Sequence, residues 1–154
     1  CNEEILPSQS FEASIDEEKF NLYTKQYNEI KTLEYFIAID ENNVVLGTSG
    51  VYSLKFDNAD SYWLGWYCVG GKYRGKGIGK LLLNHITQEV KRRGKRFLKL
   101  YTSTNPDEII AQSIYQENGF YITDDERKRI VKTSSICGSF WHTHINVSCM
   151  RHNR

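Results

Sequence analysis

The chain has few of the residues on which specialised frameworks depend. Its 154 residues include two prolines, one methionine and four cysteines. The cysteines (Cys1, Cys68, Cys137 and Cys149) lie far apart and form no Cys-x-x-Cys pair, which argues against a dense disulfide framework and a metal site. We therefore predict that the protein binds no metal. Free cysteines are typical of reducing compartments, so we also predict a cytoplasmic location, with Cys68 as a small buried side chain in a strand.

Long apolar runs and a strong charge imbalance are missing as well. No segment approaches the roughly 20 apolar residues that span a bilayer, and residues 1–9 are polar and acidic, unlike a signal peptide. The formal net charge is +1, which gives no global electrostatic case for nucleic acid. The basic cluster at residues 91–96 falls at the end of a predicted helix, where cations complement the helix dipole. We therefore predict no nucleic-acid partner and no membrane partner.

The length and the order of elements indicate one mixed α/β domain over residues 1–154. Apolar periodicity predicts helices at 15–30, 78–93 and 107–118, and strands at 35–39, 44–52, 62–69 and 97–101, with two more within 129–150. Residues 4–6 or 11–14 are the candidates for a strand before the first helix. In the helix at 78–93, the expected apolar face consists of Ile78, Leu81, Leu82, Ile86 and Val90.

A glycine-rich turn between a strand and a helix is the most informative segment. It runs from Val69 to Leu83. Glycine lets the backbone curl tightly and approach a ligand closely. The first N–H groups of a helix lack intrahelical partners and lie at the positive end of its dipole. Arg74, Lys76 and Lys80 add positive charge beside these N–H groups. The segment therefore predicts a site for a phosphate-bearing cofactor or nucleotide.

Two well-known phosphate loops do not fit this turn. A Walker-type loop requires Ser or Thr after Gly-Lys, but Gly77 follows Gly75-Lys76. The dinucleotide fingerprint Gly-x-Gly-x-x-Gly requires a third glycine where this chain has Lys80 or Leu82.

A third pattern does fit, and a second segment agrees with it. The residues Arg74-Gly75-Lys76-Gly77-Ile78-Gly79 match Arg-x-x-Gly-x-Gly, and Ala111 to Phe120 match Ala-x-x-x-Tyr-x-x-x-Gly-Phe. In these segments the chain resembles the GCN5-related N-acetyltransferase (GNAT) family, with the resemblance clearest over residues 35–121. It implies a single domain with a mostly antiparallel, twisted sheet that contains a central parallel strand pair and is flanked by helices.

The resemblance also implies an activity and a cosubstrate. Members transfer the acetyl group of acetyl-coenzyme A to a primary amine, directly within a ternary complex. The turn residues Arg74, Gly75, Lys76, Gly77, Ile78, Gly79 and Lys80 would bind the pyrophosphate. Cys68 and Val69 would contact the pantetheine arm and polarise the thioester carbonyl. Tyr115 would protonate the departing thiolate, and Asn105 would either contact the pantetheine or cap its helix.

The receiving half of the reaction stays open. Asp60, Glu34, Tyr62 or a water chain could serve as the base, whereas His85 is expected to be solvated. The acceptor is a small-molecule or peptide amine, and Trp63 and Trp66, with Tyr52 and Tyr62, would line its pocket or fill the core. The alternative function is a catalytically inactive, coenzyme A-binding regulatory module. An exposed edge among the last strands would support a homodimer.

Overall fold

The computed structural model of the chain describes residues 7–103, 106, 109–122 and 144–150. The fold is mixed α/β, with a mostly antiparallel sheet that includes a parallel strand pair and is flanked by helices, as predicted. The chain divides into two compact units, Ile5–Leu98 and the remainder. We describe each unit by itself.

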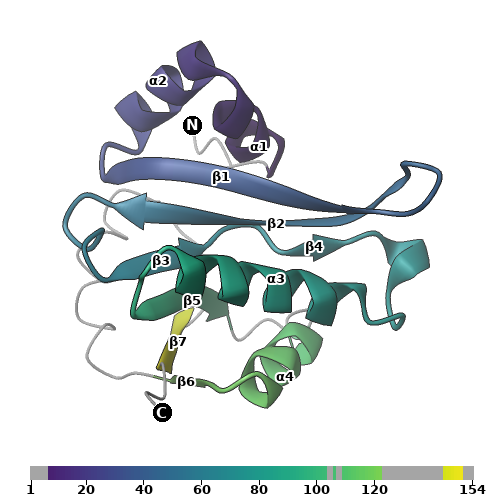
Figure 1. Ribbon diagram of the computed structural model, residues 1–154. Coiled ribbons are helices and arrows are strands. Elements are labelled where there is room, and N and C mark those ends of the chain that lie inside the picture. The colour runs from purple at the N-terminus through teal and green to yellow at the C-terminus, as the bar shows by residue number, and fades with distance from the viewer. Residues whose placement is uncertain (1–6, 104–105, 107–108, 123–143, 151–154) are drawn as a thin grey trace. The chain divides into compact units, whose positions relative to one another are not determined.

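The first unit contains most of the regular structure (Figure 1). Its elements are α1 (Pro7–Ile15), α2 (Glu17–Gln26), β1 (Ile30–Ile39), β2 (Val45–Leu54), β3 (Ser61–Leu64), β4 (Cys68–Val69), the 3₁₀ turn η1 (Gly71–Tyr73), α3 (Ile78–Arg92) and the first residues of β5 (Phe97–Ser103). The second unit contains the rest of β5 with α4 (Ile109–Glu117), β6 (Phe120–Ile122) and β7 (His144–Met150).

The N-terminal helical region differs from the prediction. The predicted helix at 15–30 is wrong at both ends, because α2 begins only after Asp16 and Ile30 opens β1. Asp16 has extended backbone angles and caps α2 by accepting a hydrogen bond from the Lys19 N–H at 2.9 Å. The capping aspartate therefore marks the start of α2, and the helix before it, α1, is one that the sequence analysis did not predict. Residues 11–14 belong to α1 and are not a strand, and residues 4–6 lie outside the described residues.

A long antiparallel hairpin, β1–β2, forms the framework of the first unit. Its pairing runs from Ile30 opposite Leu54 to Ile39 opposite Val45, so both strands extend beyond their predicted bounds. The Asp40 carboxylate closes the turn by accepting hydrogen bonds from the N–H groups of Asn42 and Val44.

Helices cover both faces of this hairpin. Tyr35 meets Phe11 of α1 with ring centroids 6.0 Å apart, whereas its neighbour Phe36 meets His85 of α3 at 5.0 Å. Successive residues of a strand point to opposite faces. Therefore α1 and α3 lie on opposite faces of β1, as Figure 1 shows.

The predicted strand at 62–69 is divided in two by a β-bulge. Val51 of β2 lies opposite Leu64 of β3, and Thr48 lies opposite Cys68 of β4. The Gly65 N–H bonds to the Gly50 carbonyl at 2.8 Å, so the two residues 66 and 67 face Ser49 alone, which is the count that defines a bulge. The extra residue bends the strand just before the glycine turn.

The strands on either side of α3 are parallel, as predicted. The Asp60 carbonyl, next to the start of β3, accepts hydrogen bonds from the N–H groups of Arg96 at 2.8 Å and Phe97 at 3.1 Å. The two strands therefore begin side by side and run in the same direction. This arrangement is the β-helix-β crossover.

The buried face of α3 is close to the predicted one, but it includes Leu83 in place of Leu81, and Ile78 is only half-buried. Leu82, Leu83, Ile86 and Val90 are buried, whereas Leu81 is 60% exposed. At 3.6 residues per turn, Leu81 lies on the far side of the helix from the line through Leu82, Ile86 and Val90. Leu83 takes the place that the sequence analysis assigned to Leu81.

The second unit combines a helix with a strand pair. Tyr115 of α4 is buried, and its ring lies 5.8 Å from that of Phe120, the first residue of β6. Phe120 in turn lies opposite Cys149 in the antiparallel β6–β7 pair. β7 falls within the predicted range 129–150, of which residues 129–143 lie outside the described residues. Among the helices that the structure describes, none is long and apolar enough to cross a membrane.

The adjacent leucines of α3 provide a matched stability test. We expect Leu83→Ala to lower the free energy of unfolding by about 3 kcal/mol, because it opens a cavity at a side chain with no exposed surface. Leu81→Ala should change it by less than about 0.5 kcal/mol. Urea denaturation measures both, and equal losses would contradict the assigned face.

Candidate functional site

The candidate site begins where β4 ends and the glycine turn leads into α3. The Gly70 N–H still bonds to the Leu46 carbonyl of β2 at 2.9 Å, and η1 then turns the chain away from the sheet. The Arg74 Nε donates a hydrogen bond at 3.1 Å to the carbonyl of Val69. This bond ties the predicted turn residues to the end of the strand.

Two glycines give the turn its conformation. Gly75 has φ +74° and Gly77 has φ +82°, in the left-handed region that favours glycine. A Cβ at either position would meet no atom within 4 Å. The requirement for glycine is therefore conformational, and the space around both residues is open.

The third glycine of the motif has a different role. A Cβ on Gly79 would lie 2.4 Å from the hydroxyl of Tyr67, with Val69 Cγ2 at 3.6 Å. Gly47 of β2 is similarly constrained, because a Cβ there would lie 2.7 Å from the Cys68 carbonyl and 3.1 Å from Leu82 Cδ1. Glycine at these positions allows α3, β4 and β2 to approach each other closely.

The start of α3 has the donors that an anion requires. Gly77 is the N-cap residue, and no side chain caps the helix. Within the part of the chain that the structure describes, none of the N–H groups from Gly75 to Lys80 donates a hydrogen bond. Lys76 and Lys80 are exposed beside these donors. Such an arrangement can hold a phosphate or pyrophosphate group.

The exposed edge of β4 offers one further donor. Opposite residues of an antiparallel pair alternate between hydrogen-bonded and non-hydrogen-bonded pairs. Because the Gly70 N–H bonds to the Leu46 carbonyl, the alternation directs the backbone N–H of Cys68 toward Thr48 of β2 and the backbone N–H of Val69 away from β2. Among the strands of this unit, β4 pairs with β2 alone. Of the two predicted contact residues on β4, Val69 is therefore the one whose N–H faces outward.

The Cys68 side chain is exposed, which corrects the prediction of a buried thiol. Tyr67, just before β4, and Val69 of β4 face α3, so Cys68 between them points to the opposite face. Partial burial raises the pKa of the Cys68 thiol, and Arg74 opposes this rise.

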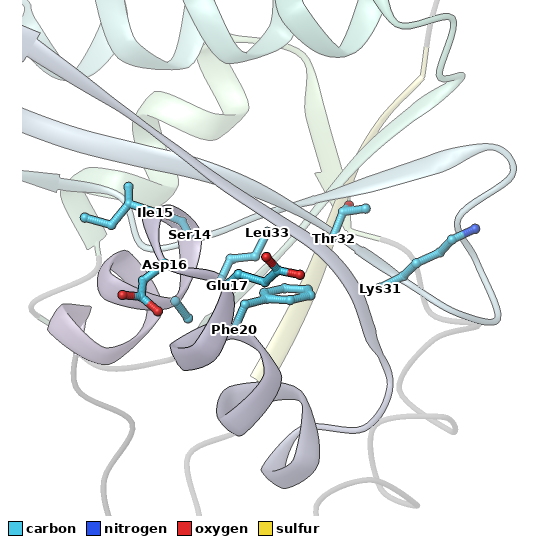
Figure 2. A pocket seen from close by; sticks show the side chains of 9 residues that line it. Ser14, Ile15, Asp16, Glu17, Phe20, Lys31, Thr32 and Leu33 are labelled. Carbon is cyan, nitrogen blue, oxygen red and sulfur yellow. The ribbon is translucent and has the colours of Figure 1, made fainter.

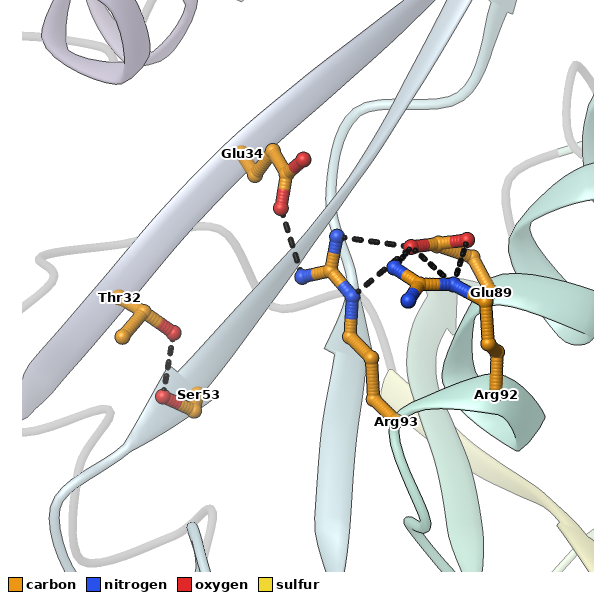
Figure 3. Close-up of polar contacts among 6 residues, drawn as sticks. All are labelled: Thr32, Glu34, Ser53, Glu89, Arg92 and Arg93. Carbon is orange, nitrogen blue, oxygen red and sulfur yellow. Dashed lines mark hydrogen bonds and ion pairs between the residues drawn. The ribbon is translucent and has the colours of Figure 1, made fainter.

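The residues considered as bases form ion pairs at the other end of α3. Arg93 bonds to Glu34 at 2.6 Å and to Glu89 at 3.1 Å, as Figure 3 shows. These contacts, the Glu34 hydrogen bond foremost, raise the pKa of the Arg93 guanidinium. Asp60 pairs with Arg96 at 3.7 Å. The 15 residues of α3 span about 22 Å, so none of these carboxylates lies near the glycine turn.

Tyr62 is placed with the same group of residues. Its ring lies 5.7 Å from the Arg93 guanidinium and 5.1 Å from the Lys95 ammonium. Such cation–π contacts stabilise the packing of charged side chains on an aromatic face. The geometry therefore gives Tyr62 a structural role.

The sequence analysis missed the part that Tyr35 plays at the bulge. Its hydroxyl accepts a hydrogen bond from the Trp66 N–H at 3.1 Å, and burial raises its pKa to about 12. The sequence signal for this contact is a pair of glycines that make room for the Tyr35 side chain. A Cβ on Gly50 would lie 2.6 Å from the Glu34 carbonyl and 2.8 Å from Tyr35 Cδ1, and a Cβ on Gly65 would lie 2.9 Å from the Tyr35 hydroxyl. Trp63 is buried and Trp66 is 40% exposed, so Trp66 is the one of these two that a ligand can reach.

A shallow groove of about 320 Å³ lies between the α1–α2 corner and the start of β1 (Figure 2). Its lining includes Asp16, Glu17, Phe20 and Leu33. Leu33 is four residues along β1 from Ile37. Ile37 is paired with Thr48 of β2, which is in turn paired with Cys68 of β4. At about 3.3 Å per residue this is roughly 13 Å. The groove is therefore separate from the glycine turn.

Two predicted residues are not among the described residues of the first unit. Tyr115 belongs to the second unit, where it is buried in α4, and Asn105 lies outside the described residues. Among the described residues, no group of three or more His, Cys, Asp and Glu side chains could hold a metal.

Comparisons with known proteins agree with this geometry. Residues 3–120 match the model of the acetyltransferase (GNAT) family. No curated protein matches the sequence significantly.

Solved structures share the fold. A GNAT acetyltransferase from Elizabethkingia anophelis with acetyl-CoA bound is 17% identical, with TM-score 0.62 and coverage of 98% of this chain and 94% of that chain. An acetyltransferase of the GNAT family from Staphylococcus aureus Mu50 is 21% identical, with TM-score 0.59 and coverage of 86% and 76%. An IAA acetyltransferase from Bacillus cereus is 18% identical, with TM-score 0.60 and coverage of 96% and 93%.

The conformational role of the turn glycines can be tested by stability alone. We expect Gly77→Ala to lower the free energy of unfolding by about 1 kcal/mol, because alanine is strained at positive φ. Gly71→Ala is the control, since its Cβ also meets open space but its φ is not positive. Urea denaturation should show a smaller change at Gly71. Equal changes would contradict the assigned role.

Proposed function

The chain belongs to the acetyltransferase (GNAT) family, and from that premise we propose that it transfers the acetyl group of acetyl-coenzyme A to a primary amine. The observation that carries the proposal is the start of α3, where free N–H groups, left-handed glycines and lysines converge. The family match spans residues of both compact units, which supports a single acetyltransferase domain over residues 1–154.

The glycine turn is proposed to bind the pyrophosphate of the cosubstrate. The N–H groups from Gly75 to Lys80 would donate to the phosphate oxygens, and Lys76 and Lys80 would balance their charge. Arg74 keeps its side chain on the Val69 carbonyl, so its contribution is to fix the corner and add positive charge. This geometry supports coenzyme A and requires no metal ion for the anion.

The edge of β4 is proposed to hold the acyl end. The pantetheine arm would run along the side of β4 that faces away from β2, with Cys68 and Val69 flanking it. The outward Val69 N–H would donate to the thioester oxygen, where negative charge develops as the amine attacks. Fixed backbone donors of this kind need no reorganisation during the reaction.

The remaining roles are proposed from the family motif. The amine nitrogen attacks the carbonyl carbon, the carbon–sulfur bond breaks, and Tyr115 donates a proton to the departing thiolate. Asn105 would contact the pantetheine. Because Glu34, Asp60 and Tyr62 have cationic partners far from the turn, we propose that the amine proton leaves through water.

Binding and turnover measured together test this function. Calorimetry should show binding of acetyl-coenzyme A, and release of free thiol should accelerate when an amine is added. Binding without amine-dependent release across a broad amine panel would favour the alternative, a catalytically inactive coenzyme A-binding module. Absence of binding would contradict both.

A glutamate in the turn should abolish cosubstrate binding. Gly77→Glu places a carboxylate where the pyrophosphate is proposed to lie, so like charges would repel. Gly94→Glu is a matched control, because Gly94 has φ +74° and open surroundings but lies at the other end of α3. Calorimetry with acetyl-coenzyme A should show binding by the Gly94 variant only. Unchanged affinity of the Gly77 variant would refute the site.

Removal of the Tyr115 hydroxyl should affect turnover more than binding. We expect Tyr115→Phe to lower kcat by about 10²-fold, in the range of a general acid, with little change in the affinity for acetyl-coenzyme A. Tyr121→Phe is the control, because Tyr121 is in the same unit and 40% exposed. Steady-state kinetics separate the two effects, and an unaltered kcat would remove the role assigned to Tyr115.

A further inference from the structure

Beside β4, one face of the sheet in the first unit has four solvent-exposed apolar side chains. We call it the apolar face and define it as Ile37, Ile39, Val45 and Trp66, which are 49%, 50%, 53% and 40% exposed. Ile39 lies opposite Val45, and Ile37 lies in line with Thr48 and Cys68. Trp66 lies in the bulge two residues before Cys68, and its N–H donates to the hydroxyl of Tyr35, whose side chain points to this side of the sheet.

Around the apolar face, this side of the sheet carries no charge among the described residues. The charged residue of β1 on this side, Lys31, lies beyond Leu33 and lines the groove described above. From Leu33 onward, the residues on this side of β1 are Leu33, Tyr35, Ile37 and Ile39, and their partners on β2 are Tyr52, Gly50, Thr48 and, across a register shift, Val45. Cys68 of β4 continues this side opposite Thr48. Phe11 of α1 covers Tyr35, and the α1–α2 corner lies over Leu33. The apolar face is the part of this side that the helices leave open.

The proposed acyl site faces the same side. α3 packs on Tyr67 and Val69 through Gly79, so helix atoms occupy the space on that side of β4. A nucleophile approaches a carbonyl carbon from above or below the plane of the group and must be aligned with it. With the thioester at the edge of β4, the open approach is across Cys68 and the apolar face.

We propose that the apolar face binds the acceptor, which is a primary amine attached to an aliphatic or aromatic group. This inference rests on the proposed function and names its substrate class. Burial of the apolar group would supply the binding energy, while the amine attacks the acetyl carbon, the carbon–sulfur bond breaks and the thiolate takes up a proton. A polyamine requires carboxylates along its length. Asp16 and Glu17 line the separate groove described above, which lies roughly 13 Å away along β1.

Two probes and two variants test the proposal. The probes are 2-phenylethylamine and spermidine, and the variants are Ile37→Ser and Leu22→Ser. Leu22 is a matched control, since it is 58% exposed on α2. With coenzyme A bound, 2-phenylethylamine should bind wild type more tightly than spermidine does. Ile37→Ser should weaken the affinity for 2-phenylethylamine about tenfold and raise the KM for this amine by the same factor, while kcat and the affinity for acetyl-coenzyme A stay unchanged. Leu22→Ser should match wild type in all of these values.

The outcomes separate the acceptor class from catalysis. Binding of 2-phenylethylamine that depends on Ile37 without any acetylation would support the apolar face and contradict the proposed function. Preference for spermidine, or affinities unaffected by Ile37→Ser, would overturn the inference. A change from dimer to monomer in Ile37→Ser, with amine binding unchanged, would also overturn it and assign the face to a second copy of the chain.

Discussion

The first turn of α3 is held against β4 by a contact that leaves no room for a side chain. Gly79 meets Tyr67 and Val69, and Gly47 brings β2 under the same contact beside Leu82. Because the helix start is fixed over the end of the strand, its free N–H groups and the outward Val69 N–H belong to one rigid corner. The left-handed Gly75 and Gly77 then let the chain join the strand to the helix without covering those donors. Donors fixed in this way can recognise an anion without reorganising.

The same contact divides the chemistry between the two sides of the sheet. α3 covers the side that Tyr67 and Val69 face, and at the bulge of residues 66 and 67 the Trp66 N–H donates to the hydroxyl of Tyr35, whose side chain points to the other side. The proposed donor site therefore lies at the edge of β4, and the uncharged apolar face lies beside it. The ion pairs of Glu34, Arg93 and Glu89 stabilise the opposite end of α3. They belong to the scaffold and take no part in the proposed chemistry.

The glycine turn, the helix after it and the parallel strands around it could be predicted, because local rules determine them. Glycine spacing and apolar periodicity act over a few residues, and both give strong patterns here. The exposure of Cys68 and Leu81 and the bulge could not be predicted in the same way. Each depends on which side of an element a distant neighbour covers, and that information lies in tertiary packing. The Val69 N–H is the clearest example of what the sequence could not predict. Its outward direction follows from the register between β4 and β2, which only the folded sheet defines.

The most direct test of the central claim is an amide chemical-shift titration with coenzyme A. In ¹H–¹⁵N spectra, the amides of Gly75, Gly77 and Gly79 should shift strongly as the ligand is added, together with that of Val69. The amide of Gly94, which has a similar backbone conformation at the other end of α3, should stay unchanged. Saturable binding that leaves the amides of the glycine turn unshifted would contradict the account.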